Sequence, residues 1–298
     1  ADGIVVNAQF HNDDHTVVVS QPGSLQLKKS VDHVLDLQDK DQVYTLQVRN
    51  FSETLRVQSP TIIDVLPYNG DATNAALVNR NPASKHTGSN KLDAAPTVFQ
   101  FNGTTPATGT FYYTTVAPAS VPQDLNADTD PSIWSTTFTP NATAFKFVAD
   151  KPLGTINDGP ASGLVIKFKT DQSGNAAGDL YANRFTAFSK TFFNQEKYQI
   201  LTSNQVLVRV IGFSLGDLVW FDKDNDGKFT PGVDQAAPEG VQVEVHKADG
   251  SLAPGGKVTT NKDGRWVVND LPEGDYYAVI PASQFAPGGP LEGYVVQT

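Results

Sequence analysis

The sequence predicts an all-β fold of two immunoglobulin-like β-sandwich domains in tandem, the first larger and with long insertions. Short runs rich in Val, Ile, Thr, Phe and Tyr recur along the chain, and clusters of Gly, Pro, Asn and Asp separate them. Almost no window places apolar residues at helical spacing. The 298 residues are enough for two β domains with separate cores.

Composition excludes several classes of protein. Cysteine is absent, so disulfides, cysteine ligands and cysteine nucleophiles are excluded together. Thirty-two acidic against twenty-two basic residues give a net charge of -10, which repels nucleic acid. The chain lacks the long apolar run of a membrane span, so this segment is not expected to be membrane-embedded. It begins at "ADGIVV" and contains no methionine, which suggests a processed piece of a longer protein.

The first domain is predicted to span residues 1–212. Two polar stretches, residues 69–97 and 118–130, are expected to be insertions between strands, the former holding a short helix or a surface excursion. The predicted strands, in chain order, are "GIVVNAQF", "HTVVVS", "SLQLKKSVD", "VYTLQVRN", "TIIDVL", "GTFYYTTV", "LVIKFKT" and "VLVRVIGF". After the last of these, strand spacing tightens and acidic turns appear, which predicts a second domain at 213–298.

Three strands of the first domain place a polar residue on an apolar face. They are Lys29 in "SLQLKKSVD", Asp64 in "TIIDVLP" and Asn183 in "YANRFTAF". A buried ammonium must lose its charge or find partners. Burial of Lys29 therefore costs stability unless its amine takes part in an interaction or a reaction.

An amine, a carboxyl and a carboxamide in one interior meet the requirements of a spontaneous intramolecular isopeptide bond. Burial lowers the lysine pKa to give a neutral nucleophile, and it raises the aspartate pKa so that the acid can polarise the amide and shuttle protons. The predicted catalytic set is therefore Lys29, Asp64 and Asn183, for autocatalytic bond formation alone. In the alternative, Lys29 reaches the rim, Asp64 caps a turn and Asn183 binds backbone. Lys28 is the substitute nucleophile if the register slips by one residue.

These strands carry a resemblance to a known group of domains. "LKKSVDHVLDLQDKDQVYTLQVRN", "TIIDVLPYNGD" and "YANRFTAFSKT" resemble the isopeptide-forming immunoglobulin-like domains of Gram-positive pilins and adhesins. The resemblance implies a lysine in the first strand, a catalytic acid in a middle strand and an asparagine in the last. Here those positions are Lys29, Asp64 and Asn183.

The second domain contains a loop with the spacing of a calcium site. In "DKDNDGKFTPGVD", residues 222–234, aspartates occupy positions one, three and five, glycine position six, and a main-chain carbonyl is available at position seven. Position twelve is Val233, so the loop is irregular or takes its last ligand from elsewhere, with Asp234 and Glu239 as the candidates. The predicted Ca²⁺ ligands are Asp222, Asp224, Asp226, the carbonyl of Lys228, Thr230 and Asp234. The alternative is a solvated acidic turn.

Most of the second domain resembles the calcium-binding B-type repeat of serine-aspartate adhesins, a domain of the Cna B-like kind. "SLGDLVWFDKDNDG", "GVQVEVHKADGS", "TTNKDGRWVVNDLPEGDYYAVIP" and "FAPGGPLEGY" carry this resemblance. A further cluster, "HNDDH" with His11 and His15, could bind a metal, but a solvated loop is the favoured interpretation.

Together these features predict a structural segment of a bacterial cell-surface adhesin, pilin or extracellular filament, located outside the cell or in its wall. Its partners would be other copies or neighbouring domains of a surface protein. A second hypothesis is an adhesin module that binds host protein or glycan through the insertions of the first domain. A third is a non-catalytic accessory region of a secreted carbohydrate-active enzyme. No nucleophile elbow, phosphate loop or HExxH motif occurs, so no enzyme is predicted.

Overall fold

The chain divides into two compact units, residues 1–210 and 211–298, in this computed structural model. The structure describes residues 6–9, 16–19, 25–72, 79–123, 131–189 and 200–296. Strands dominate both units, and the helical segments among the described residues are short 3-10 turns: η1 (Pro118–Ser120), η2 (Pro131–Ile133), η3 (Ile156–Ser162) and η4 (Ala282–Phe285). The prediction of an all-β fold is confirmed. No helix in the described ranges is long and apolar enough to cross a membrane.

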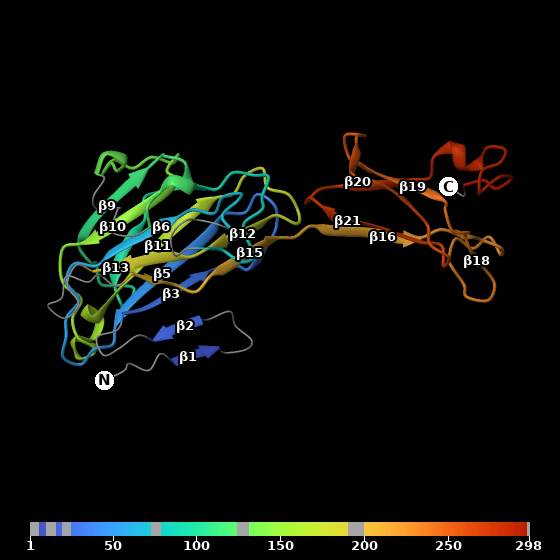
Figure 1. Ribbon diagram of the computed structural model, residues 1–298. Coiled ribbons are helices and arrows are strands. Elements are labelled where there is room, and N and C mark those ends of the chain that lie inside the picture. The colour runs from blue at the N-terminus through green and yellow to red at the C-terminus, as the bar shows by residue number, and fades with distance from the viewer. Residues whose placement is uncertain are drawn as a thin grey trace. The chain divides into compact units, whose positions relative to one another are not determined.

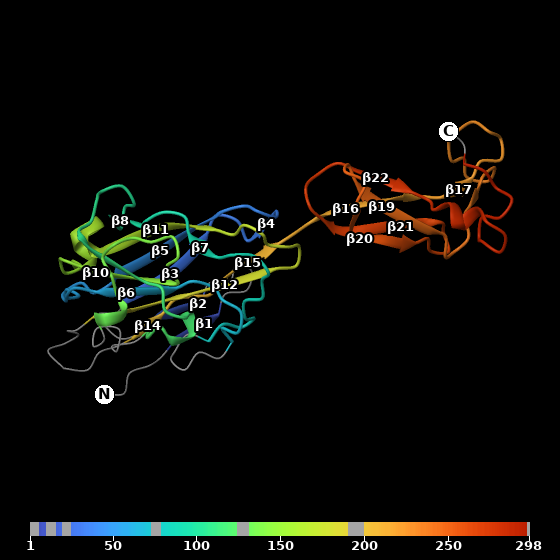
Figure 2. The same cartoon turned by 90° about the horizontal axis from the view of Figure 1, so that it is seen from above.

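The first unit is built on two large sheets, which Figures 1 and 2 show as facing layers. The first sheet has the order β14 (Leu201–Thr202), β13 (Phe185–Phe188), β6 (Thr61–Val65), β10 (Ala144–Ala149) and β9 (Gly109–Thr114). The second has the order β3 (Leu25–Val31), β5 (Gln42–Asn50), β11 (Gly163–Asp171) and β7 (Lys91–Leu92), and β8 (Thr97–Gln100) also pairs with β11. All these strand pairs are antiparallel.

The main core lies between these two sheets. Alternate residues of each strand enter it, which is the period-two pattern of a sandwich layer. In β5, for example, Tyr44, Leu46 and Val48 are fully buried, while the residues between them are half-exposed. They pack in one cluster with Ile62 of β6 and Phe145 of β10.

Smaller sheets complete the first unit. β12 (Leu180–Asn183) pairs antiparallel with β15 (Val206–Val210), which pairs in parallel with β4 (Leu35–Asp36). β1 (Val6–Gln9) and β2 (Thr16–Val19) form an antiparallel hairpin. His11 and His15 of the "HNDDH" cluster lie outside the described residues.

The two polar insertions contribute buried residues to the first unit. In the first, the described residues form β7 and bury Asp71, Arg80 and Leu92. The second begins with η1 and sends Val121 against the outer face of the five-stranded sheet, where it packs with Ile63 and Val65 of β6. Strand β6 is therefore buried on both faces.

The second unit has its own core and smaller sheets. Its core includes Val243, Val245, Trp266 and Val268. Its pairs are β16 (Phe213–Leu218) with β21 (Arg265–Leu271), β17 (Trp220–Phe221) with β18 (Gln235–Ala236), and β19 (Gln242–Lys247) with both β20 (Leu252–Thr259) and β22 (Tyr276–Val279). The acidic loop predicted to bind calcium connects β17 to β18.

Candidate functional site

Lys29 is fully buried in the main core of the first unit. In β3 the side chains of Leu25, Leu27 and Lys29 point inward, whereas Lys28 is exposed. The ammonium nitrogen lies 5.1 Å from the ring centroids of both Tyr44 and Phe168. The strand register in which Lys28 would face the core as the nucleophile is therefore not adopted. Lys29 also does not extend to solvent at the edge of the sandwich.

Asp64 is the charge partner of Lys29. It lies in β6, also fully buried, and its Oδ2 contacts the Lys29 Nζ directly. Burial lowers the pKa of Lys29 from 10.5 to about 8, although the nearby Asp64 carboxylate opposes this shift. Burial also raises the pKa of Asp64, against the opposing charges of Lys29 and Arg80. Both shifts favour the neutral forms, an amine beside a carboxylic acid.

Asn183 ends β12 and is fully buried on the same interior. Phe185, two residues later in the chain, pairs with Asp64 across β13 and β6. The Asn183 side chain is close enough to be one of the groups that oppose the rise of the Asp64 pKa caused by burial. Within the described part of the chain, neither Asn183 Nδ2 nor Asp64 Oδ1 has a hydrogen-bond partner of good geometry.

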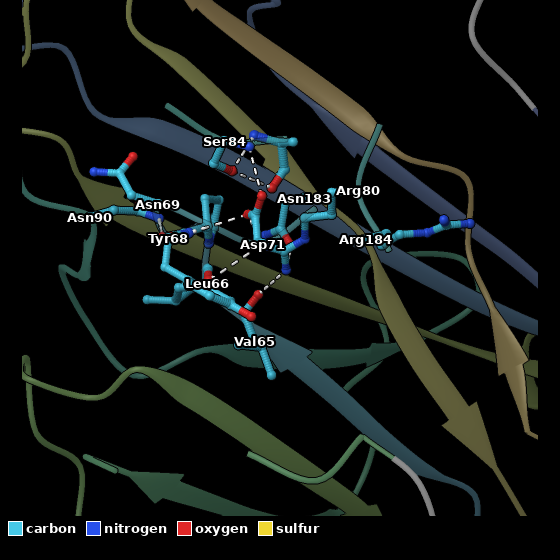
Figure 3. A network of polar contacts seen from close by, with 12 residues as sticks. Val65, Leu66, Tyr68, Asn69, Asp71, Arg80, Ser84, Asn90, Asn183 and Arg184 are labelled. Carbon is cyan, nitrogen blue, oxygen red and sulfur yellow. Dashed lines mark hydrogen bonds and ion pairs between the residues drawn. The ribbon is translucent and has the colours of Figure 1, made fainter. Parts of the chain in front are cut away.

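A buried arginine, which sequence reasoning missed, adjoins this trio. The Arg80 Nη2 donates to Asn183 Oδ1 at 3.1 Å and to the carbonyl oxygen of Val65 (Figure 3). Its Nη1 donates to Asp71 Oδ2 at 2.8 Å. Arg80 and Asp71 belong to a polar segment without strand periodicity, so no sequence pattern signalled that they would be buried beside Asn183.

A second missed residue fixes the backbone of Lys29. Asn204 Oδ1 accepts a hydrogen bond from the Lys29 main-chain N at 2.8 Å, and Asn204 Nδ2 donates to the Lys29 carbonyl at 2.9 Å. The Asn204 carboxamide is thus occupied by backbone, while that of Asn183 keeps its nitrogen unpaired. Asn204 precedes β15, which lies near β3. Asn204 therefore fixes the β3 main chain at Lys29.

The arrangement has the parts of an amide-forming site. A lysine amine with a lowered pKa is a nucleophile, a buried carboxylic acid can relay protons, and the carboxamide beside it can be attacked. Aromatic and aliphatic walls exclude water, which would otherwise stabilise the charged amine. Packing holds these groups before any reaction, and such preorganisation supplies much of the rate of an intramolecular step.

The acidic loop of the second unit gathers three carboxylates. Oxygen atoms of Asp222, Asp224 and Asp226 all lie within 4.8 Å of one another. Asp222 also accepts hydrogen bonds from the backbone N–H groups of Asn225 at 2.7 Å and Gly227 at 2.8 Å, which wrap the loop around it. Asn225 and Gly227 have positive φ angles of 61° and 76°, which give the loop its sharp turn.

Asp234 closes the loop. Its Oδ1 accepts from the backbone of Lys223 at 2.9 Å, and its Oδ2 accepts from the backbone of Thr230 at 2.6 Å. Partial desolvation and the negative charges of Asp226, Asp234 and Asp222 raise the pKa of Asp224. Lys228 is exposed and Thr230 half-buried. A divalent cation among these oxygens would relieve the repulsion that raises the Asp224 pKa.

Comparison with known proteins finds a family model that resembles part of the second unit. The family model of the SdrD B-like domain matches residues 213–287. This match confirms the predicted resemblance over that segment. Colossin-A of Dictyostelium discoideum is 35% identical over 77 residues, which are 25% of this chain and 1% of that protein.

Solved structures of surface proteins also resemble the chain. The major pilin subunit BcpA of Bacillus cereus gives a TM-score of 0.39 at 11% identity, covering 86% of this chain and 58% of that one. The group B streptococcus pilus 2b backbone protein gives 0.33 at 15% identity, covering 84% and 82%. The collagen-binding domain of a Staphylococcus aureus adhesin gives 0.28 at 13% identity, covering 62% and 95%. The chain thus spans less than two thirds of the BcpA structure.

Proposed function

We propose that this chain is a structural segment of a bacterial cell-surface adhesin, pilin or extracellular filament. An internal Lys29–Asn183 amide would rigidify its first domain, residues 1–212, and calcium would rigidify its second, residues 213–298. The observation that carries the proposal is the Lys29–Asp64 pair at the centre of the sandwich. A buried ion pair adds little to stability compared with apolar packing, so its presence calls for another use. The SdrD B-like match supports an extracellular setting with neighbouring domains as partners.

The proposed reaction balances without any cofactor. The neutral Lys29 Nζ attacks Cγ of Asn183, and a C–N bond forms as the Cγ–Nδ2 bond breaks. The protonated Asp64 donates its proton to the departing nitrogen, which leaves as ammonia, and takes up the proton that the amine loses, so that the acid is regenerated. The product is an uncharged amide, so the cost of burying a charged lysine disappears.

For calcium, the proposed ligands are the carboxylates of Asp222, Asp224, Asp226 and Asp234, the Lys228 carbonyl and the Thr230 hydroxyl. Hard oxygen ligands at alternate positions suit Ca²⁺, and extracellular modules bind it with Kd values around 10⁻⁴ to 10⁻³ M. A site of that affinity stays occupied outside the cell. It would act as a permanent brace for the β17–β18 loop.

Intact mass spectrometry of the purified chain tests the crosslink. We expect the wild-type mass to be lower than that calculated from sequence by one ammonia, and tandem spectra of a digest to join the peptides that contain Lys29 and Asn183. Lys29→Ala and Asp64→Ala should each restore the calculated mass. Lys28→Ala is the matched control, because Lys28 is the exposed neighbour on the same strand, and it should keep the deficit. An unmodified wild-type mass would refute the crosslink.

A further inference from the structure

Arg80 places a positive charge inside the first unit against a reacting atom of the proposed crosslink. Its side chain is 1% exposed. Besides the contacts with Asp71 and Asn183, Nη1 lies 3.4 Å from the Leu66 carbonyl oxygen and Nη2 contacts that of Val65 (Figure 3). The guanidinium is therefore held on several sides, and one of its N–H groups is directed at the Asn183 side chain.

This contact fixes the orientation of the Asn183 carboxamide. A guanidinium only donates hydrogen bonds, so it must face the amide oxygen and not the amide nitrogen. The Nδ2 group is then turned away from Arg80, and it is the Asn183 atom that lacks a partner among the described residues, as does Asp64 Oδ1. Asn183 Oδ1 thus faces the Arg80 guanidinium. Asn183 Nδ2, the nitrogen that leaves as ammonia, can then take a proton from Asp64.

We propose that Arg80 is a catalytic residue of isopeptide formation, stabilising the negative charge that develops on Asn183 Oδ1 when Lys29 attacks. This inference rests on the proposed crosslink. As Nζ bonds to Cγ, the carbonyl electron pair moves onto Oδ1, 3.1 Å from the Arg80 Nη2 donor. When the tetrahedral centre collapses, the pair returns to re-form the carbonyl, and ammonia departs with the proton that Asp64 relays. Arg80 gives up no proton.

A purely structural role explains less of the geometry. The ion pair with Asp71 uses only Nη1, at 2.8 Å. Nη2 instead donates to Asn183 Oδ1 and to the carbonyl oxygen of Val65. Asp71 is itself anchored, because its Oδ1 accepts from the Ser84 backbone at 2.7 Å. A donor held rigidly before the reaction needs no reorganisation when charge develops. This property gives such donors their effect, and removing one costs on the order of 100-fold to 1,000-fold in rate.

The rate of crosslinking in newly made protein tests the proposal. The full chain is synthesised in a cell-free system, synthesis is stopped, and the fraction that has lost ammonia is followed by intact mass. Arg80→Gln combined with Asp71→Asn removes both charges together, so that no unpaired charge remains buried. We expect this variant to form the amide about 100-fold more slowly than wild type. Arg80→Lys, which keeps a cation with different geometry, should be slowed less.

Arg184→Gln is the matched control. Arg184 follows Asn183 in sequence, but it donates to the backbone carbonyls of Asn79 and Ser203 and not to the carboxamide. It should crosslink at the wild-type rate. Circular dichroism establishes that each variant is folded. If the folded Arg80 variants react as fast as wild type, the role of Arg80 is refuted and the crosslink stands. If wild type itself keeps its calculated mass, both ideas fail.

Discussion

At the residue scale, burial makes Lys29 both costly and reactive. The same desolvation that lowers the pKa of its amine to about 8 removes stability from any folded chain in which it stays unlinked and charged. Asp64 offsets part of that cost through direct contact. Conversion to an amide would remove the titrating amine altogether, so the uncrosslinked protein should carry a pH signature that the crosslinked protein lacks.

That signature appears in Asn183→Ala, which keeps Lys29 and Asp64 but cannot form the amide. Between pH 8 and 10.5 the folded state binds fewer protons at Lys29 than the unfolded state does, so the free energy of unfolding should rise with pH across this window. The rise is on the order of 3 kcal/mol. The raised pKa of Asp64 has the opposite effect. The folded state binds more protons at Asp64 than the unfolded state does, so this group makes the free energy of unfolding fall as pH rises above the ordinary aspartate pKa. Urea denaturation at pH 7.5 and pH 10 measures the change.

The control for this pH effect is Lys29→Met, which has neither crosslink nor titrating amine. Its stability should lack the rise between pH 8 and 10.5. Equal pH dependence in Asn183→Ala and Lys29→Met would show that the Lys29 amine is not the titrating group. Wild type should resemble Lys29→Met in this respect, because an amide nitrogen does not titrate.

At the element scale, period-two alternation explains why part of the site was predictable. Lys29 and Asp64 each occupy an inward position of a strand whose neighbouring inward residues are apolar, so their burial followed from local sequence. Arg80, Asp71 and Asn204 lie between strands, where no period shows which way a side chain points. Their positions depend on how distant segments close over the sheets. The order of the strands within each sheet depends on the same non-local closure and was not predicted.

The acidic loop is the opposite case, because its geometry is set within thirteen consecutive residues. Asp224→Asn should weaken calcium binding about tenfold or more by removing one charged ligand. The metal-free variant should be no less stable than the metal-free wild type, because a carboxylate repelled by Asp226 and Asp234 is gone. Isothermal calorimetry measures the affinity. Asp263→Asn, in the separate turn "NKDGR", is the control and should bind calcium as wild type does. Unchanged affinity in Asp224→Asn would exclude Asp224 as a ligand.

At the scale of the whole molecule, two units with separate cores hold two different proposed reinforcements. The cluster around Tyr44 and Phe145 belongs to residues 1–210, and that around Val245 and Trp266 belongs to residues 211–298. A covalent crosslink forms once and does not depend on solution conditions, whereas a bound ion exchanges with its surroundings. Treatments that act on one reinforcement should therefore leave the melting of the other unit unchanged.

Differential scanning calorimetry with and without a chelator tests this independence. Calcium bound to the folded loop stabilises it by RT ln(1 + [L]/Kd), about 2.7 kcal/mol at a hundredfold excess over Kd. For a unit of this size, that shifts the melting temperature by on the order of 10 °C. We expect chelation to lower the transition of residues 211–298 alone, and Asp64→Ala to lower that of residues 1–210 alone. Superimposable curves with and without chelator would show that the loop is an acidic turn that binds no calcium. A shift of both transitions on chelation would show that calcium acts beyond the β17–β18 loop.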